Sequence, residues 1–258
     1  MNTTTASSNP TAPAAVPGAA PRTVLVWDAP VRVFHWLMVL SFIGAYVTAE
    51  SERFRLLHVS LGYTMAGLIV FRLLWGIVGT RHARFSAFVR GPSAAWRYVR
   101  SLVNGQPEHH TGHNPAGALA IVALLALGAL TTLSGWANYQ EIGGEWLEEL
   151  HEGAGNAMLA IVLLHVTGVL VSSFVHHENL VRAMITGRKP VAPSEGIAQA
   201  WRSVAVVMLV AVLGFWWLQW RDAPQAGVDG RPAATEKARG AGGEAARAKG
   251  ERKKRHDD

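Results

Sequence analysis

Long apolar blocks separated by short polar stretches dominate the chain. Five such blocks run over residues 31–49, 56–79, 115–136, 149–175 and 204–220. A soluble domain would interrupt its apolar positions with a period of 2 or 3.6 residues, whereas these blocks are nearly continuous. Each is close to the roughly 20 residues that cross the hydrocarbon core of a bilayer as a helix. The pattern predicts an all-α integral membrane protein, a four-helix transmembrane bundle with a fifth, C-terminal transmembrane helix.

The two ends of the chain have a different composition. Residues 1–23 are rich in Ala, Pro, Thr and Ser and lack the basic start and apolar core of a secretory signal. The C-terminal stretch consists mainly of Ala, Gly, Lys, Arg and Glu. We therefore expect a disordered N-terminal tail (1–23), a linker with the fifth helix (190–220) and a disordered basic tail (221–258).

The charges between the blocks predict the orientation. The loop after the second block carries five arginines, whereas the loop after the third carries four glutamates and no Lys or Arg: Arg81, Arg84, Arg90, Arg97 and Arg100 against Glu141, Glu145, Glu148 and Glu149. Short cytoplasmic loops are the basic ones. We expect a multi-pass protein of the bacterial inner (plasma) membrane with a cytoplasmic N-terminus, although five spans then place the basic C-terminal tail outside.

Composition excludes several functions. The net charge is +6, but the basic residues cluster at block ends and in the tail without a recognition motif, which argues against nucleic-acid binding. There is no cysteine. Disulfides, iron–sulfur clusters, thiolate ligation and covalent c-type haem attachment are therefore excluded, and any haem must be held through His or Met.

Four histidines lie within or at the ends of the blocks. His151 and His165 share the fourth block and are fourteen residues apart, which on a helix is a rise of about 21 Å with a return to nearly the same face. His58 begins the second block, on the predicted outer side, and His35 begins the first, on the inner side. The depths match in two pairs, His58 with His151 and His35 with His165. Ionisable residues in a membrane are costly, so we expect two bis-histidine haem sites; the alternative is interfacial histidines bonded to backbone or water.

Arg72 is fourteen residues beyond His58, on the same helix face and at the predicted depth of His165. We expect it to pair with a propionate of the inner haem, since a buried guanidinium needs an anion; the alternative is an arginine whose head reaches the surface. His109, His110 and His113 form a loop motif, HHTGH. Because the loop offers only Glu108 as a further ligand, we expect a solvated loop rather than a metal site. The alternative for His113 is a contribution near the inner surface, where quinone headgroups lie.

Several motifs together resemble one family. The chain resembles the bacterial cytochrome b561 and nickel–iron hydrogenase b-type cytochromes in three motifs. They are RVFHW before the first block, LHVSLGYTMAGLIVFRLLWG in the second, and two histidines separated by thirteen residues in the fourth. RHARF, RGP, GHNP and ENLVRAMITGRK are similar to the cytochrome b/b6-domain branch. The resemblance implies a four-helix di-haem cytochrome b domain over residues 24–189. It also implies two haem b groups, whose irons are ligated by His35, His58, His151 and His165. It also implies partners: quinone, and a periplasmic cytochrome c or a hydrogenase-like redox subunit.

The expected function is electron transfer across the membrane between the quinone pool and a redox protein. Such a cytochrome need not be an enzyme by itself and can be part of a quinone-linked oxidoreductase complex. The competing functions are a membrane transporter and a non-redox anchor subunit; a transporter is expected to show internal repeats or broken helices, and neither is evident.

Overall fold

The computed structural model describes residues 23–106, 108 and 110–221. The contacts divide the chain into two compact units, residues 1–217 and 218–258, and the fold described below is that of the first. The tails predicted to be disordered, 1–23 and 221–258, lie outside the described residues except for Thr23 and Arg221. The predicted four-part organisation of the chain stays a prediction.

Long helices account for most of the described chain. They are α1 (Ala29–Thr48), α2 (Arg55–Val78), α5 (Pro115–Tyr139), α6 (Glu145–Val175) and α8 (Arg202–Arg221). These are the five candidate membrane spans found in the described residues. The prediction of an all-α membrane protein with five long apolar helices is confirmed. The helices start up to four residues earlier than predicted, because the blocks were bounded by hydropathy and the first turns of α1 and α6 are partly polar.

Polar caps decide where two of these helices begin. The Asp28 Oδ1 accepts a hydrogen bond from the Val31 N–H at 2.8 Å, and the Asn114 Oδ1 accepts one from the Gly117 N–H at 2.7 Å. Each cap is followed within two residues by a proline, which suits a first helical turn. The second carboxylate oxygen of Asp28 accepts from the Trp75 indole N–H at 3.1 Å and the Thr80 hydroxyl at 2.6 Å. Asp28 therefore ties the start of α1 to the end of α2.

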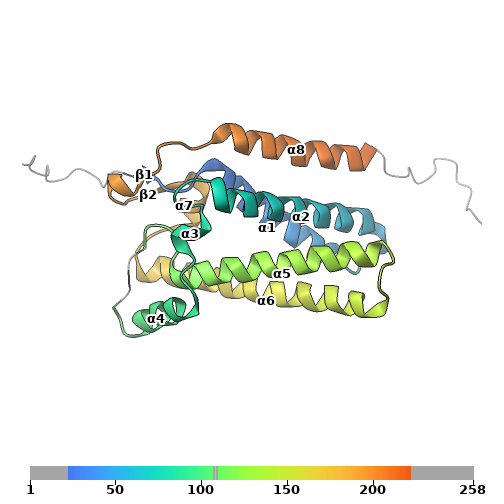
Figure 1. The fold of residues 1–258 in the computed structure, drawn as a ribbon, viewed down its shortest axis with the longest axis horizontal. Helices are drawn as coiled ribbons and strands as arrows, with labels where there is room; N and C mark the ends of the chain where they lie inside the picture. The colour runs from blue at the N-terminus through green and yellow to red at the C-terminus, as the bar shows by residue number, and fades with distance from the viewer. Residues whose placement is uncertain (1–22, 107, 109, 222–258) are drawn as a thin grey trace, which may run out of the picture. The chain divides into compact units, whose positions relative to one another are not determined.

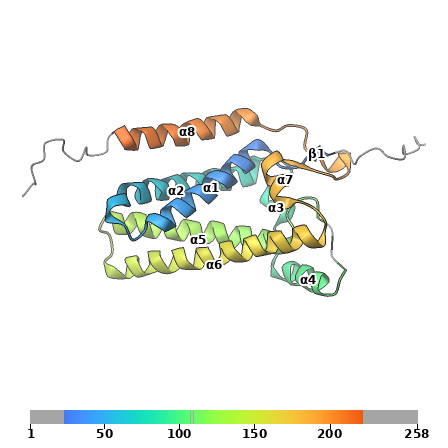
Figure 2. The ribbon, with the colours of Figure 1, turned by 180° about the vertical axis from the view of Figure 1, so that it is seen from behind.

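Two helical hairpins form the bundle. α1 packs against α2, α5 packs against α6, and α2 also contacts α5 (Figures 1 and 2). Phe42, Met65 and Met158, from α1, α2 and α6, form a buried apolar cluster between the hairpins. α8 joins through Met208, which packs with Leu37 and Leu68. The four long helices α1, α2, α5 and α6 thus share an interior.

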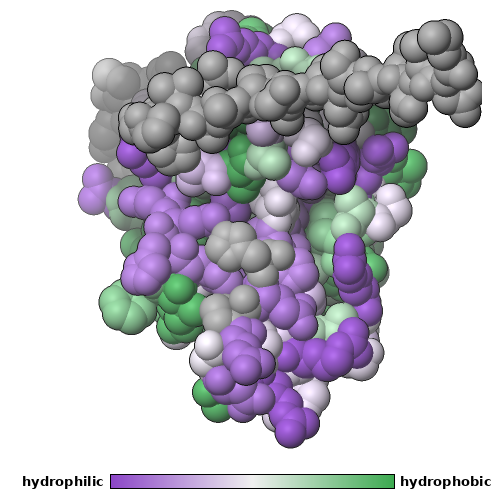
Figure 3. All heavy atoms as spheres, turned by 90° about the vertical axis from the view of Figure 1, so that its left-hand side faces the viewer, coloured by the Kyte–Doolittle hydropathy of each residue, from purple (hydrophilic) through white to green (hydrophobic). Residues whose placement is uncertain are grey.

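Short elements gather at the arginine-rich end of the bundle. They are α3 (Phe85–Phe88), α4 (Pro92–Val103), α7 (Leu180–Thr186) and the antiparallel pair β1 (Val24–Leu25) and β2 (Arg188–Lys189) (Figure 1). Two 3-10 turns, η1 (Glu52–Phe54) and η2 (Pro193–Glu195), complete the fold. Figure 3, which views this end, shows mainly hydrophilic residues among the atoms that are not grey. The buried Lys189 ammonium pairs here with the Glu178 carboxylate at 2.8 Å.

Candidate functional site

His58 of α2 and His151 of α6 meet inside the bundle, at the end opposite the arginine-rich loop. Their ring centroids are 6.0 Å apart and the ring planes are inclined by 78°. The His58 Nδ1 lies 2.8 Å from the Ala45 carbonyl oxygen, and the His151 Nδ1 lies 2.9 Å from the Thr131 carbonyl oxygen. A carbonyl oxygen only accepts, so each Nδ1–H donates and each Nε2 keeps its lone pair. This is how metal-ligating histidines are usually oriented.

The geometry of this pair fits one metal atom between two imidazoles. Metal–nitrogen bonds to histidine are about 2 Å long, so two rings flanking one metal have their centroids about 6 Å apart. Gly135 of α5 makes room for one ring, because a Cβ at this position would lie 2.6 Å from His151 Cε1. A bare structural metal ion usually takes four protein ligands, so a set of two imidazoles fits a haem better than a bare metal ion.

His35 of α1 and His165 of α6 are neighbours rather than a contacting pair. Charges on the two imidazoles would interact electrostatically, but no ring contact between them occurs among the described residues. The His35 ring instead packs edge-on against Trp36, with centroids 5.1 Å apart, and its buried Nδ1 has no hydrogen-bond partner. The structure therefore brings the predicted outer pair together and leaves the inner pair looser, with a polar atom that needs a partner.

The two histidine pairs are separated by the apolar cluster of Phe42, Met65 and Met158. Met158 lies seven residues from both His151 and His165, and Met65 lies seven residues from both His58 and Arg72. Seven residues are nearly two helical turns, so each of these series occupies one helix face. This spacing places the apolar cluster midway between two polar levels.

Arg72 is enclosed rather than extended to the surface. Its side chain is only 3% exposed, and the guanidinium carbon lies 4.7 Å from the centroid of the Phe85 ring and 5.9 Å from that of Phe88. One of its terminal nitrogens is buried and has no hydrogen-bond partner. The surface-reaching alternative does not fit this environment, whereas an anion beside the guanidinium does.

His113 was expected in a solvated loop, but the structure encloses it. Its ring lies 4.5 Å from both Trp27 and Phe88, and its Nδ1 is buried without a hydrogen-bond partner. Burial lowers the pKa of His113 from 6.5 to about 3, and the positive charge of Arg72 contributes, followed by His165, His82 and His35. His113 therefore stays neutral at ordinary pH. The Asn114–Pro115 helix start was the signal that could have placed it against the bundle.

A cavity of about 200 Å³ lies beside His113. Its lining is mostly basic and polar and includes Arg81, His82, Arg90, His110 and Glu195. His110 also lies 3.5 Å from the Glu108 carboxylate. His109, the remaining histidine of the motif, lies outside the described residues.

Comparison with known proteins places the chain in a family. The family model for prokaryotic cytochrome b561 matches residues 26–187, a range that contains both histidine pairs and Arg72. The chain belongs to the prokaryotic cytochrome b561 family. It is therefore a multi-pass membrane protein of a b-type cytochrome family, and haem b is the cofactor that this membership implies.

Curated relatives carry hydrogenase names. A probable Ni/Fe-hydrogenase B-type cytochrome subunit of Azotobacter chroococcum is 28% identical, over 64% of this chain and 87% of the relative. The protein of the same name from Rhodobacter capsulatus is 24% identical, over 64% and 81%. A probable Ni/Fe-hydrogenase 1 B-type cytochrome subunit of Escherichia coli K12 is 28% identical, over 45% and 60%. No solved structure gives a significant match.

Proposed function

We propose that this protein is a membrane b-type cytochrome that carries electrons between the quinone pool and a redox protein through two bis-histidine haem b groups. His58 and His151 would hold one haem, and His35 and His165 the other. The observation that carries the proposal is the first pair, two imidazoles 6.0 Å apart that each keep Nε2 available.

The ligand sets point to electron transfer rather than substrate chemistry. A haem iron held by two imidazoles would have no position left for O₂ or a substrate. The haems would supply one-electron redox chemistry when bound. His151 and His165, about 21 Å apart by helix rise, would hold one group each, and the buried apolar cluster of Phe42, Met65 and Met158 lies between them.

Arg72 is proposed to bind a propionate of the haem held by His35 and His165. Its buried, unpartnered guanidinium nitrogen supports this role. Arg72→Gln removes a positive charge that favours the reduced haem, so the midpoint potential of that haem should fall by about 60 mV or more, a tenfold change in a one-electron equilibrium. In Arg72→Lys, which keeps the positive charge, the midpoint potential should fall less. A potentiometric titration of the Soret band that showed equal potentials in all three proteins would contradict this role.

The two ends of the molecule are proposed to have different partners. The arginine-rich end faces the cytoplasm by the positive-inside rule, which makes the N-terminus cytoplasmic in a bacterial plasma membrane. We place quinone exchange at this end, where His113 and the basic cavity lie. The other end carries exposed glutamates, Glu141 in the α5–α6 turn and Glu145 and Glu148 in the first turn of α6, and would dock a periplasmic cytochrome c or a hydrogenase-like subunit. The names of the relatives favour the hydrogenase-like partner.

The experiment is anaerobic reduction by quinol. Purified protein in lipid vesicles should show reduced b-haem bands after addition of a menaquinol or ubiquinol analogue. The double variant His35→Ala/His165→Ala should lose haem at the quinone end and react far more slowly. A parent whose fully loaded haems do not respond to either quinol would contradict the quinone half of the proposal. An anchor or transporter would tolerate loss of all four histidines without a change in assembly or transport.

A further inference from the structure

Helix α4 has three distinct faces. Ala94, Ala95 and Tyr98 are buried against the bundle, where α4 packs on α5. Trp96, Val99 and Val103 are apolar yet 69%, 40% and 82% exposed. Residues turn by about 100° each along a helix, so these three fall within about 60° of one another. The exposed arginines Arg97 and Arg100 lie on the flank beside them.

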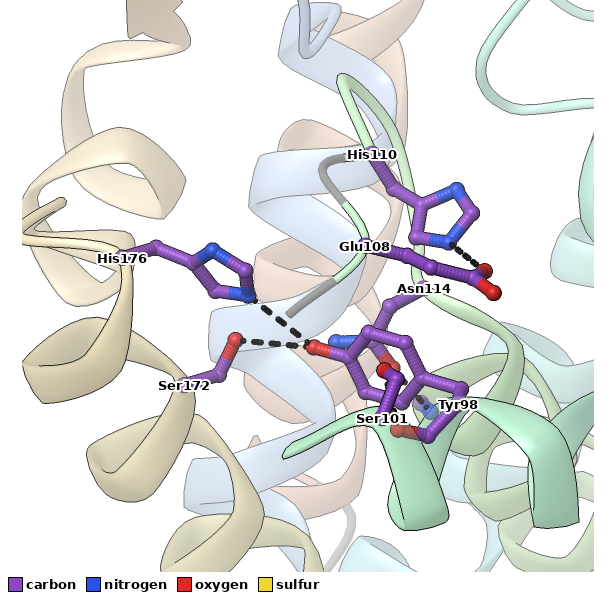
Figure 4. A network of polar contacts seen from close by, with 8 residues as sticks. Tyr98, Ser101, Glu108, His110, Asn114, Ser172 and His176 are labelled. Atoms are coloured by element: carbon purple, nitrogen blue, oxygen red, sulfur yellow. Dashed lines mark hydrogen bonds and ion pairs between the residues drawn. The ribbon is translucent and has the colours of Figure 1, made fainter. Parts of the chain in front are cut away.

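Tyr98 fixes the depth of this helix. Its hydroxyl lies 3.4 Å from the Ser172 Oγ and 3.3 Å from the His176 Nε2 (Figure 4). Ser172 belongs to the last turn of the membrane-spanning α6, and His176 directly follows its last residue. α4 therefore lies at the level where the long helices leave the hydrocarbon. An exposed tryptophan and two valines at this level suit the boundary between acyl chains and headgroups.

The charge around α4 has one sign. Residues 79–105 contain five arginines and no Asp or Glu. Arg81 pairs with Glu195 at 3.8 Å, whereas no ion pair of Arg90, Arg97 or Arg100 occurs within the described ranges. Exposed guanidinium groups beside an apolar stripe complement phosphate groups, which they bind through two parallel hydrogen bonds.

We propose that α4 is an interfacial helix that binds anionic phospholipids. Trp96, Val99 and Val103 enter the leaflet at the arginine-rich end, and Arg90, Arg97 and Arg100 bind the lipid phosphates. This combination of an apolar stripe and a basic flank is the arrangement by which helices lie in a membrane surface. The proposal requires neither a haem nor a protein partner.

The depth of α4 in the membrane can be measured directly. Because the chain has no cysteine, a spin label attaches only at an introduced one. Val103→Cys and Ser93→Cys, spin-labelled and reconstituted in phosphatidylglycerol-containing nanodiscs, sample the apolar stripe and the polar flank. The label at 103 should be relaxed by oxygen and shielded from an aqueous nickel chelate, and the label at 93 should show the reverse. Equal, strong relaxation of both labels by the chelate would overturn the proposal, because α4 would then lie in water.

Lipid binding is tested with matched arginine variants. Arg90→Gln/Arg97→Gln/Arg100→Gln should bind phosphatidylglycerol at least about tenfold more weakly by native mass spectrometry, whereas Arg53→Gln/Arg55→Gln, exposed arginines at the opposite end, should bind like the parent. Circular dichroism confirms that each variant is folded. Equal phosphatidylglycerol binding by both variants would overturn the proposal. Equal phosphatidylglycerol binding together with loss of a co-purifying subunit from the triple variant alone would also overturn the proposal. This outcome would assign the surface to a protein partner.

Discussion

Gly135 shows how one residue can permit a binding site. The imidazole of His151 lies where a Cβ at this position would be, 2.6 Å from Cε1 and 2.8 Å from Nδ1. The same ring nitrogen donates to the carbonyl of Thr131, one helical turn earlier on α5. The glycine and the carbonyl together set both the position of the ring and the nitrogen that it leaves free.

Gly135→Ala is therefore expected to displace the His151 ring. The variant should lose most of the haem proposed to bind at His58 and His151 and should keep the haem proposed for His35 and His165, since that pair lies about 20 Å away. Pyridine haemochrome assay per polypeptide measures the loss. Gly214→Ala is the matched control, because an added Cβ there meets nothing within 4 Å. Full haem content in Gly135→Ala would contradict the inference that Gly135 makes room for the His151 ring.

His113 makes the fold sensitive to acid. Burial and nearby positive charge hold its pKa at about 3, below the ordinary 6.5. Below pH 6.5 the His113 side chain is protonated in the unfolded chain but not in the folded chain. The contribution of neutral His113 to the free energy of unfolding is therefore complete above pH 6.5 and is lost progressively as the pH falls toward 3. At pH 5 the loss is about 2 kcal/mol.

Replacement of His113 by Gln should reduce the fall in Tm between pH 8 and pH 5. Thermal unfolding followed by tryptophan fluorescence measures the difference. The control is His177→Gln, an exposed histidine just after α6. An identical pH dependence in the parent and in His113→Gln would show that His113 is not held neutral by the fold.

At the scale of elements, the helix ends are held by buried polar contacts that hydropathy does not reveal. Asp28 caps α1 and also accepts from Trp75 and Thr80 near the end of α2. An N-cap contributes about 1 kcal/mol, and each donor left unsatisfied in a buried position costs about 1–3 kcal/mol. The contacts of Asp28 are therefore worth more than those of a cap alone.

Asp28→Ala should destabilise the protein by about 3 kcal/mol, from the lost cap and two unpaired donors. Asn179→Ala removes only the exposed cap of α7, whose Oδ1 accepts from the Arg182 N–H, and should cost about 1 kcal/mol. Chemical denaturation in detergent compares the two. Equal losses would indicate that the contacts of Asp28 to α2 add nothing.

The long apolar helices were predictable from the sequence, and the shorter elements were not. The apolar blocks identify all five long helices because each block is long enough to span a bilayer. Helix α4 is not predicted by the hydropathy pattern, because its apolar stripe has just three residues. Its arginines indicate only on which side of the membrane the loop lies. The pairing of Val24–Leu25 with Arg188–Lys189 joins two-residue strands far apart in sequence, and no local pattern predicts such a contact.

For the whole molecule, the sequence predicted the two histidine pairs from their depths in the membrane rather than from a motif. Topology and the fourteen-residue spacing were enough to pair His58 with His151, and the structure brings their rings together. The same argument paired His35 with His165, where the structure shows neighbours and an unpartnered nitrogen. His113 escaped prediction because its burial depends on Trp27 and Phe88, residues distant in sequence.

The most direct test of two bis-histidine sites is the number of haems per polypeptide in the parent, His151→Ala and His165→Ala. We expect about two haem b groups in the parent and about one in each variant, with different residual spectra because different sites survive. One haem in the parent and one in His165→Ala would contradict the second site, and a well-folded parent without haem would contradict both sites.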